Sequence, residues 1–216
     1  MKNIIFIAPP AAGKGTMSDI LIQKYGYKHI STGDILRSMA KREDDFGKNL
    51  SAMLASGNLV PDAIVYEALK RRLLMNDLSD GFILDGFPRN IEQAREYDKI
   101  LKEINKDLGV VIYLDTPRDI LEKRITGRRI CQKCGATYNV LTGVNMPKVE
   151  NICDKCGGEL YQRSDDNLES FNTRYETFLE KTYPLVDYYE KGNVLYRIKS
   201  VDVENTMKEI EAIIND

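Results

Sequence analysis

Short hydrophobic runs separated by stretches of helical spacing dominate the pattern of this chain. Such runs lie at 4–7, 81–85, 110–115 and 194–198. A strand that is buried on both faces shows a continuous apolar run rather than alternation. Between the runs, apolar residues recur three or four positions apart, as at Met17, Ile20, Leu21 and Tyr25. The pattern therefore predicts an α/β fold, with a parallel β-sheet flanked by helices on both faces.

The pattern ends in an amphipathic helix, and two segments interrupt it. Val203, Met207, Ile210 and Ile214 fall on one stripe of the last segment. In the first of these segments, 31–60, the sequence predicts only short helices. The second, 127–164, holds all four cysteines, has few long apolar runs and cannot build a hydrophobic core of its own. We expect a core made of 1–30, 61–126 and 165–216, with these two segments as insertions.

Composition and charge narrow the classes of function. The 216 residues are 43% hydrophobic and 30% charged, and 31 Lys and Arg nearly balance 33 Asp and Glu. The formal charge of −2 gives no basic field for nucleic acid, and no run approaches the roughly 18 apolar residues that cross a bilayer. The apolar run at 4–7 is too short for the hydrophobic part of a signal peptide. We expect a cytoplasmic protein without a membrane or nucleic-acid partner.

A glycine-containing loop connects the first predicted strand to the first predicted helix. Its sequence is Ala8-Pro9-Pro10-Ala11-Ala12-Gly13-Lys14-Gly15-Thr16. Backbone N–H groups and a helix N-terminus at this place form a cradle for phosphate, and Lys14 would reach the β- and γ-phosphates. Ala8 and Ala11 stand where such loops usually have glycine. An alanine at positive φ costs about 1–2 kcal/mol, so these dihedral angles either suit alanine or are strained.

The four cysteines form two pairs with metal-binding spacing. Cys131 and Cys134 make one Cys-x2-Cys pair, Cys153 and Cys156 make the other, and eighteen residues separate the pairs. This spacing predicts one structural Zn²⁺ per chain, held by four thiolates. Four protein ligands leave no open position for chemistry, and the metal would replace the missing core of the insertion. Free thiols or disulfides are the alternative.

Further motifs follow in a fixed order: Ser31-Thr32-Gly33-Asp34, Arg37, Asp85-Gly86-Phe87-Pro88-Arg89, Thr126-Gly127-Arg128-Arg129, Arg163-Ser164-Asp165-Asp166 and Arg174. Together with the phosphate loop, they resemble the adenylate kinase family over essentially the whole chain. The resemblance implies a P-loop nucleoside monophosphate kinase core, an AMP-binding insertion at 31–60 and a zinc-ribbon-like lid at 127–164. It also implies reversible phosphoryl transfer from Mg²⁺-bound ATP to AMP, giving two ADP, by a cytoplasmic monomer.

The resemblance assigns the site residues. It places ATP at Ala11, Ala12, Gly13, Lys14, Gly15, Thr16, Arg128, Thr137, Tyr138 and Lys199. It places AMP at Thr32, Arg37, Asn58, Leu59, Val60, Gly86, Phe87, Pro88, Arg89, Gln93, Arg163 and Arg174. It gives catalytic roles to Lys14, Asp85, Arg89, Arg124, Arg128, Arg163 and Arg174. Phosphoryl transfer is accelerated mainly by positioning and by positive charge around the transferring group, and arginine binds phosphate oxygens bidentately.

Three acidic residues and the single histidine each have a functional and a structural interpretation. Asp85 is expected to hold a water of Mg²⁺, since Mg²⁺ usually keeps its waters, although a capping role before Gly86 is the alternative. Asp165 and Asp166 resemble the acidic pair at which the family's lid hinges and which steadies the arginines, with a purely structural ion pair equally favoured. His29 is expected to be a packed, structural imidazole.

Other functions remain open from sequence alone. Thr32 and Gln93 are the positions that read the AMP base in the family, but the chain can also be a kinase of UMP or CMP. The two loop alanines leave a catalytically weakened nucleotide sensor as another reading. A zinc-ribbon nucleic-acid binder is less favoured, because 127–164 mixes charges and lacks interleaved aromatic residues. The lid also lacks the usual aromatic near 144–148 and has extra residues near 141–143, so its contact with adenine is expected to differ.

Overall fold

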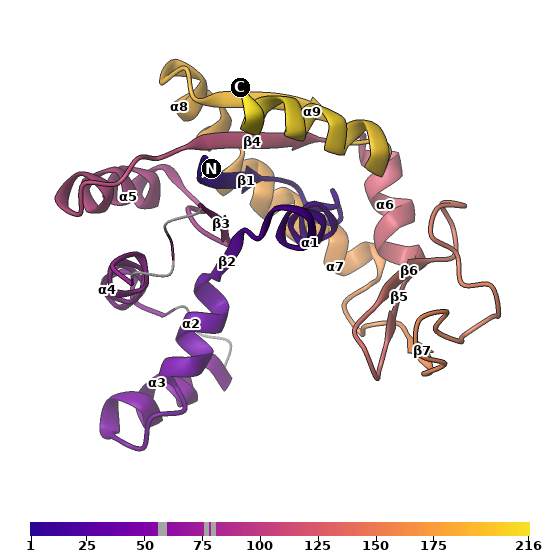
Figure 1. The fold of residues 1–216 in the computed structure, drawn as a ribbon. Coiled ribbons are helices and arrows are strands. Elements are labelled where there is room, and N and C mark those ends of the chain that lie inside the picture. Colours follow the sequence, from indigo (N-terminus) through magenta and orange to yellow (C-terminus); the bar gives the residue numbers. More distant parts are fainter. Residues whose placement is uncertain (56–59, 76–77, 79–80) are drawn as a thin grey trace.

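A parallel five-stranded sheet forms the centre of the protein (Figure 1). The computed structural model describes residues 1–55, 60–75, 78 and 81–216. The sheet order is β2-β3-β1-β4-β8, and all four neighbouring pairs are parallel. The strands are β1 (Ile4–Ile7), β2 (Lys28–Ser31), β3 (Phe82–Asp85), β4 (Val110–Asp115) and β8 (Leu195–Lys199). The predicted α/β class is confirmed.

Helices cover both faces of the sheet, which explains the continuous hydrophobic runs. Alternate residues of β1 serve opposite faces, because Ile5 and Ile7 belong to one core cluster and Ile4 and Phe6 to the other. The first cluster joins α4 (Asp62–Leu73), α5 (Ile91–Glu103) and α8 (Pro184–Lys191) to the sheet. The second joins α1 (Lys14–Tyr25), α6 (Arg118–Gly127), α7 (Leu168–Thr177) and α9 (Val203–Asn215). A strand with helices on both sides can have no polar face.

One strand of the central sheet was not predicted. β2 has the sequence Lys-His-Ile-Ser, and only Ile30 is buried. It lies at the edge of the sheet, where its polar side chains reach solvent, so the hydrophobic signal is missing. The other strands of the central sheet agree with prediction to within one residue. Helix α1 begins at Lys14, so its first turn lies inside the phosphate loop.

The two predicted insertions lie on opposite sides of the core in Figure 1. The first carries α2 (Thr32–Met39) and α3 (Asp45–Ala55), and the Ser31 hydroxyl caps α2 by accepting from the Asp34 N–H. The second carries an antiparallel sheet of order β6-β5-β7, made of β5 (Arg128–Cys131), β6 (Thr137–Asn139) and β7 (Leu160–Tyr161). A π-helical turn, Phe178–Thr182, joins α7 to α8. Within the described residues, no helix has the length and apolar character to cross a membrane.

The second insertion, residues 127–164, is called the lid below and is attached to the C-terminal end of α6. The last four carbonyls of a helix lack partners inside it. Here residues of the lid supply a partner for each: Asn139 Nδ2 to Arg124 O, Arg128 N to Ile125 O, Gln162 Nε2 to Thr126 O and Val140 N to Gly127 O. The polar groups of the lid therefore satisfy the helix terminus and fix the direction in which the small sheet leaves the core.

Candidate active site

The phosphate loop turns between β1 and α1 in a left-handed conformation. Gly13 is the N-cap of α1 with φ of +100°, and Ala11 has φ of +65°. Glycine tolerates such an angle, whereas alanine is strained by it. Ala8 does not have a positive φ. Of the two alanines that replace glycine, only Ala11 is therefore strained.

Asp85 joins the phosphate loop to the loop that follows β3. Its carboxylate forms an ion pair with the Lys14 ammonium and lies 3.3 Å from His29 Nε2. Partial burial alone would raise the pKa of Asp85, but His29 and Lys14 outweigh this and hold the pKa well below its usual range. The hydrogen bond to Asp85 raises the pKa of His29 above 6.5. The prediction of a packed histidine was wrong, because the edge position of β2 leaves this ring exposed.

Arg124 is fixed beside the phosphate loop by backbone oxygens. Its guanidinium donates to Ala12 O at 3.1 Å and to Val201 O at 2.7 Å. The Ser200 hydroxyl also donates to Ala12 O, at 3.0 Å. Burial lowers the pKa of Arg124. The guanidinium thus links α6, the chain after β8 and the loop, and Ser200 is a member of this cluster that the sequence did not reveal.

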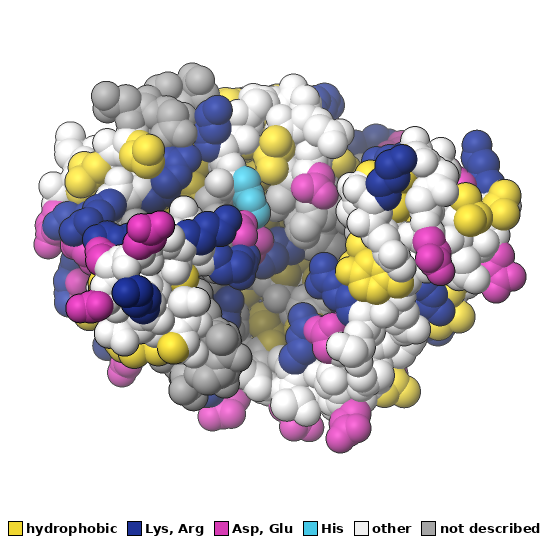
Figure 2. Space-filling model, turned by 90° about the horizontal axis from the view of Figure 1, so that it is seen from below, with side chains coloured by type: hydrophobic (Ala, Val, Ile, Leu, Met, Phe, Trp, Pro, Cys, Tyr) yellow, Lys and Arg dark blue, Asp and Glu magenta, His cyan; other side chains and the backbone are white. Residues whose placement is uncertain are grey.

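Carboxylates hold two further arginines. Arg128 Nε donates to Asp166 Oδ2 at 2.9 Å, and a second Arg128 nitrogen donates to the other oxygen of the same carboxylate. The Asp166 side chain is 0% exposed, so its charge depends on this bidentate pair. Arg174 lies 3.2 Å from Asp165 at an exposed position. Figure 2 shows Lys and Arg side chains around a hollow in the centre of one face.

A second cluster forms where α2, α4, α5 and the loop after β3 meet. The Thr32 hydroxyl donates to Gly86 O at 3.4 Å, and Arg89 Nε donates to the same oxygen at 2.9 Å. Gln93 Oε1 accepts from Arg89 N at 2.9 Å, and Gln93 Nε2 donates to Asp62 Oδ1 at 3.0 Å. A backbone N–H can only donate and a carboxylate only accepts, so the two neighbours fix the orientation of the Gln93 amide. Asp62 was not found from the sequence.

The remaining predicted residues are placed as follows. Arg37 is exposed and paired with Asp34; Val60 is half-buried; Phe87 and Pro88 are buried, with the Phe87 ring in the core; Thr137, Arg163 and Lys199 are exposed. Asn58 and Leu59 lie outside the described residues. Tyr138 is buried, and its hydroxyl contacts a cysteine of the lid. A contact of Tyr138 with ATP would therefore have to come from its backbone.

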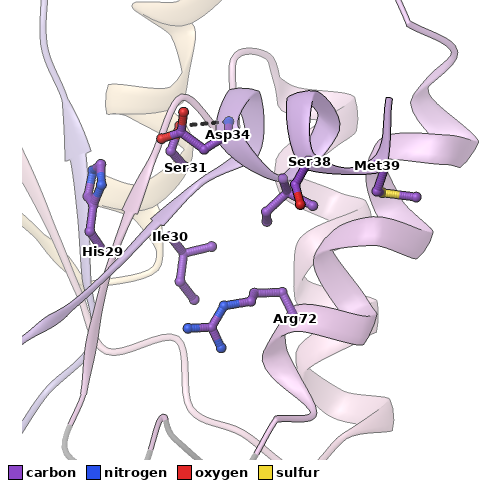
Figure 3. A pocket seen from close by; sticks show the side chains of 8 residues that line it. His29, Ile30, Ser31, Asp34, Ser38, Met39 and Arg72 are labelled. Carbon is purple, nitrogen blue, oxygen red and sulfur yellow. Dashed lines mark hydrogen bonds between the residues drawn. The ribbon is translucent and has the colours of Figure 1, made fainter. Parts of the chain in front are cut away.

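A separate pocket of about 350 Å³ lies on another side of α2 (Figure 3). Its lining includes His29, Ser31, Asp34, Ser38 and Arg72. It shares none of its lining residues with the cluster around Thr32, Gly86, Arg89 and Gln93. The pocket is therefore not part of that cluster, although His29 borders the pocket and also contacts Asp85.

The four cysteines of the lid come together. Their sulfur atoms all lie within 4.8 Å of one another, with 3.5 Å between Cys131 and Cys156 and 3.6 Å between Cys134 and Cys153. All four are free thiols. A tetrahedron with zinc–sulfur bonds of about 2.3 Å has edges of about 3.8 Å, close to these two distances. The donor set and its geometry therefore fit a four-coordinate metal ion.

Comparison with known proteins decides the family. The family model described as adenylate kinase matches residues 6–194. The chain belongs to the adenylate kinase family. Named adenylate kinases of similar sequence include one from Archaeoglobus fulgidus, 46% identical over 98% of this chain and 97% of the relative. One from Thermosipho africanus is 44% identical over 98% and 99%, and one from Thermodesulfovibrio yellowstonii is 47% identical over 96% and 94%. The family resemblance seen in the motifs is confirmed.

The left-handed angle of Ala11 makes its replacement by glycine testable. Ala11→Gly removes about 1–2 kcal/mol of strain and adds about 0.4–1 kcal/mol of unfolded-state entropy. We expect the free energy of unfolding, measured by urea denaturation without nucleotide, to stay unchanged or rise by up to about 1.6 kcal/mol. Ala8→Gly is the matched control and is expected to lose stability. An equal loss in the two variants would show that Ala11 is unstrained.

The contact of His29 with Asp85 predicts a pH-dependent contribution to stability. The pKa of His29 is raised in the folded protein, so its contribution is complete below about pH 6.5 and is lost as the pH rises through the folded pKa. His29→Gln should therefore lower the free energy of unfolding more at about pH 5.5 than at about pH 8.5. Urea denaturation of both proteins at the two pH values measures this. The same difference at both values would contradict the assignment.

Proposed function

We propose that this protein catalyses the reversible transfer of a phosphoryl group from Mg²⁺-bound ATP to AMP, giving two ADP. The observation that carries the proposal is the pairing of Lys14 with Asp85. Strands β1 and β3 are parallel neighbours, so the loops at their carboxyl ends lie side by side. One loop supplies a phosphate cradle, and the other supplies Asp85 and Arg89. Maintenance of the adenine nucleotide balance is the corresponding physiological role.

Each group has a distinct task in this reaction. Lys14 moves from the carboxylate of Asp85 to the phosphate oxygens of ATP, while Arg124 and Arg128 bind the transferring group from the lid side. Asp85 stays ionised because of its lowered pKa and would hold a water of Mg²⁺, which neutralises phosphate charge. Arg89 would bind the phosphate of AMP. Positioning and positive charge, rather than a covalent intermediate, lower the barrier.

The remaining assignments of the sequence analysis belong to the same proposal. Arg37, Arg163 and Arg174 complete the phosphate ligands, and residues 31–60 and 127–164 act as the AMP-binding insertion and the lid on the core. Asp165 and Asp166 support the role of steadying arginines, because each forms an ion pair with one of them. The protein would act as a cytoplasmic monomer without a nucleic-acid partner, as expected for the family.

The Gln93 amide supports AMP as the acceptor over UMP, because uracil presents the reverse order of donor and acceptor, whereas cytosine shares the order of adenine and is separated from it only by the assay below. Its two fixed neighbours leave one lone pair on Oε1 and one N–H on Nε2. Adenine offers an amino donor beside a ring nitrogen acceptor, which matches these two free positions. The Thr32 hydroxyl lies at the same cluster through Gly86. The opposite amide orientation would present the wrong order of donor and acceptor.

A coupled assay of ADP formation tests the proposed function. ATP is supplied with AMP, UMP, CMP or GMP, and turnover is expected with AMP at a specificity constant well above that of the others. Preference for UMP or CMP would favour a pyrimidine nucleotide kinase. Binding of ATP without turnover with any acceptor would favour a nucleotide sensor and would contradict the proposal.

Substitution of the cationic groups separates transition-state stabilisation from binding. Lys14→Ala and Arg89→Ala should each lower kcat by at least about 100-fold with a smaller change in KM, because charge on the transferring group grows toward the transition state. Arg95→Ala, at an exposed position of α5, is the control and should leave both constants unchanged. Steady-state kinetics with ATP and AMP give the result. A loss confined to KM would mean that the two residues only bind substrate.

We also propose that the four cysteines hold one structural Zn²⁺. Cys153→Ser, or removal of the metal by a chelator, should lower Tm through the lid, because metal binding free energy is folding free energy at such a site. Activity below that Tm should largely persist, since Arg124, Arg163 and Arg174 lie outside the cysteine turns. Zinc content by elemental analysis and turnover of the intact and chelated protein test this. Substoichiometric zinc in reduced protein would defeat the structural role.

A further inference from the structure

Tyr138 lies inside the lid, against the cysteine cluster. It is the central residue of β6, is 4% exposed, and packs with Cys131, Cys153 and Leu160. Its hydroxyl oxygen lies 3.4 Å from Cys153 Sγ. The Asp154 N–H donates to the same oxygen at 2.8 Å. A buried phenol is thus held between a metal-ligand sulfur and a backbone amide.

The two neighbours determine which hydrogen bond the Tyr138 hydroxyl accepts and which it donates. The Asp154 N–H can only donate, so the phenol oxygen accepts at that position and its own proton is free for the sulfur. A metal-bound cysteine is a thiolate and can only accept. The hydroxyl of Tyr138 therefore donates to Cys153 Sγ.

The charge of the site explains why such a donor matters. Four thiolates around one Zn²⁺ carry a net charge of −2, and two of the cysteines are buried. Backbone N–H groups of the cysteine turns face the sulfur atoms of Cys131 and Cys153. Within residues 127–164, all of which the structure describes, Tyr138 supplies the side-chain hydroxyl that reaches a sulfur. Groups of this kind outside the ligand shell typically change metal affinity about 10–100-fold.

We propose that Tyr138 is a positioning residue for the lid metal, whose hydroxyl stabilises and orients the Cys153 thiolate. This inference rests on the proposed zinc site and gives the Tyr138 side chain a role separate from the expected contact of this residue with ATP. The same chain of bonds reaches further, because Asp154 Oδ1 accepts from the Lys148 N–H at 3.0 Å. The metal is thereby connected through Cys153, Tyr138 and Asp154 to the loop that departs from the family pattern.

Zinc competition measures the proposed role. Purified Tyr138→Phe, Tyr161→Phe and unchanged protein are loaded with Zn²⁺ and titrated with a chromophoric chelator. Tyr161 is the matched control, since it lies in strand β7 of the same lid sheet but is 40% exposed. We expect Tyr138→Phe to lose zinc affinity about 10–100-fold and Tyr161→Phe to stay within about twofold of the unchanged protein. With Co²⁺ in place of Zn²⁺, the thiolate-to-metal absorption band should shift in Tyr138→Phe only.

Stability measurements separate this role from simple packing. The decrease in Tm caused by Tyr138→Phe should be larger in the zinc-loaded protein than in the zinc-free protein. An equal decrease in both forms, or an unchanged zinc affinity, would overturn the inference while leaving the zinc site itself intact. Failure of the unchanged protein to bind zinc would overturn the proposed metal site and this inference together, with the coupled ADP assay still testing the enzyme activity separately.

Discussion

The ion pair between Lys14 and Asp85 is the contact around which the rest of the site is arranged. It joins the ends of two neighbouring parallel strands, and both side chains remain partly exposed, at 32% and 26%. A buried pair would be fixed, whereas in the proposed reaction this pair would separate, with Lys14 binding phosphate and Asp85 holding a water of Mg²⁺. His29 and Arg124 lie on either side of the contact, one on Asp85 and one on the phosphate loop.

The lid is stabilised in a different way from the core. Its segment buries only a small cluster of Cys131, Tyr138, Cys153 and Leu160, and the four cysteine sulfurs lie within 4.8 Å of one another beside it. The proposed metal would add the stability that so small a cluster lacks. Its polar groups satisfy the carbonyls that α6 leaves open at its end. The buried pair of Asp166 and Arg128 lies at the same junction. The lid is therefore a small unit with its own buried cluster, and hydrogen bonds and an ion pair join it to the core.

The local sequence pattern predicted most of the fold. Features that depend on contacts between residues far apart in the sequence could not be predicted in this way. Strands covered on both faces carry an unmistakable apolar run, whereas β2 is an edge strand with one buried residue and gives no such signal. The phosphate loop and the cysteine pairs are short motifs, so their chemistry was visible in sequence. The strain at Ala11, the exposure of His29, the contact of Asp62 with Gln93 and the burial of the Tyr138 hydroxyl all depend on tertiary placement. The spacing of residues along the chain does not reveal these four features.

Disproportionation of ADP tests the central claim most directly. The protein is incubated with Mg²⁺ and ADP alone, and the nucleotides are followed by phosphorus NMR. If Lys14, Arg89 and the arginines of the lid serve two nucleotides in one site, ATP and AMP appear in equal amounts and no inorganic phosphate is released. Unchanged ADP, or release of phosphate without formation of ATP, would contradict phosphoryl transfer between adenine nucleotides as the function of this site.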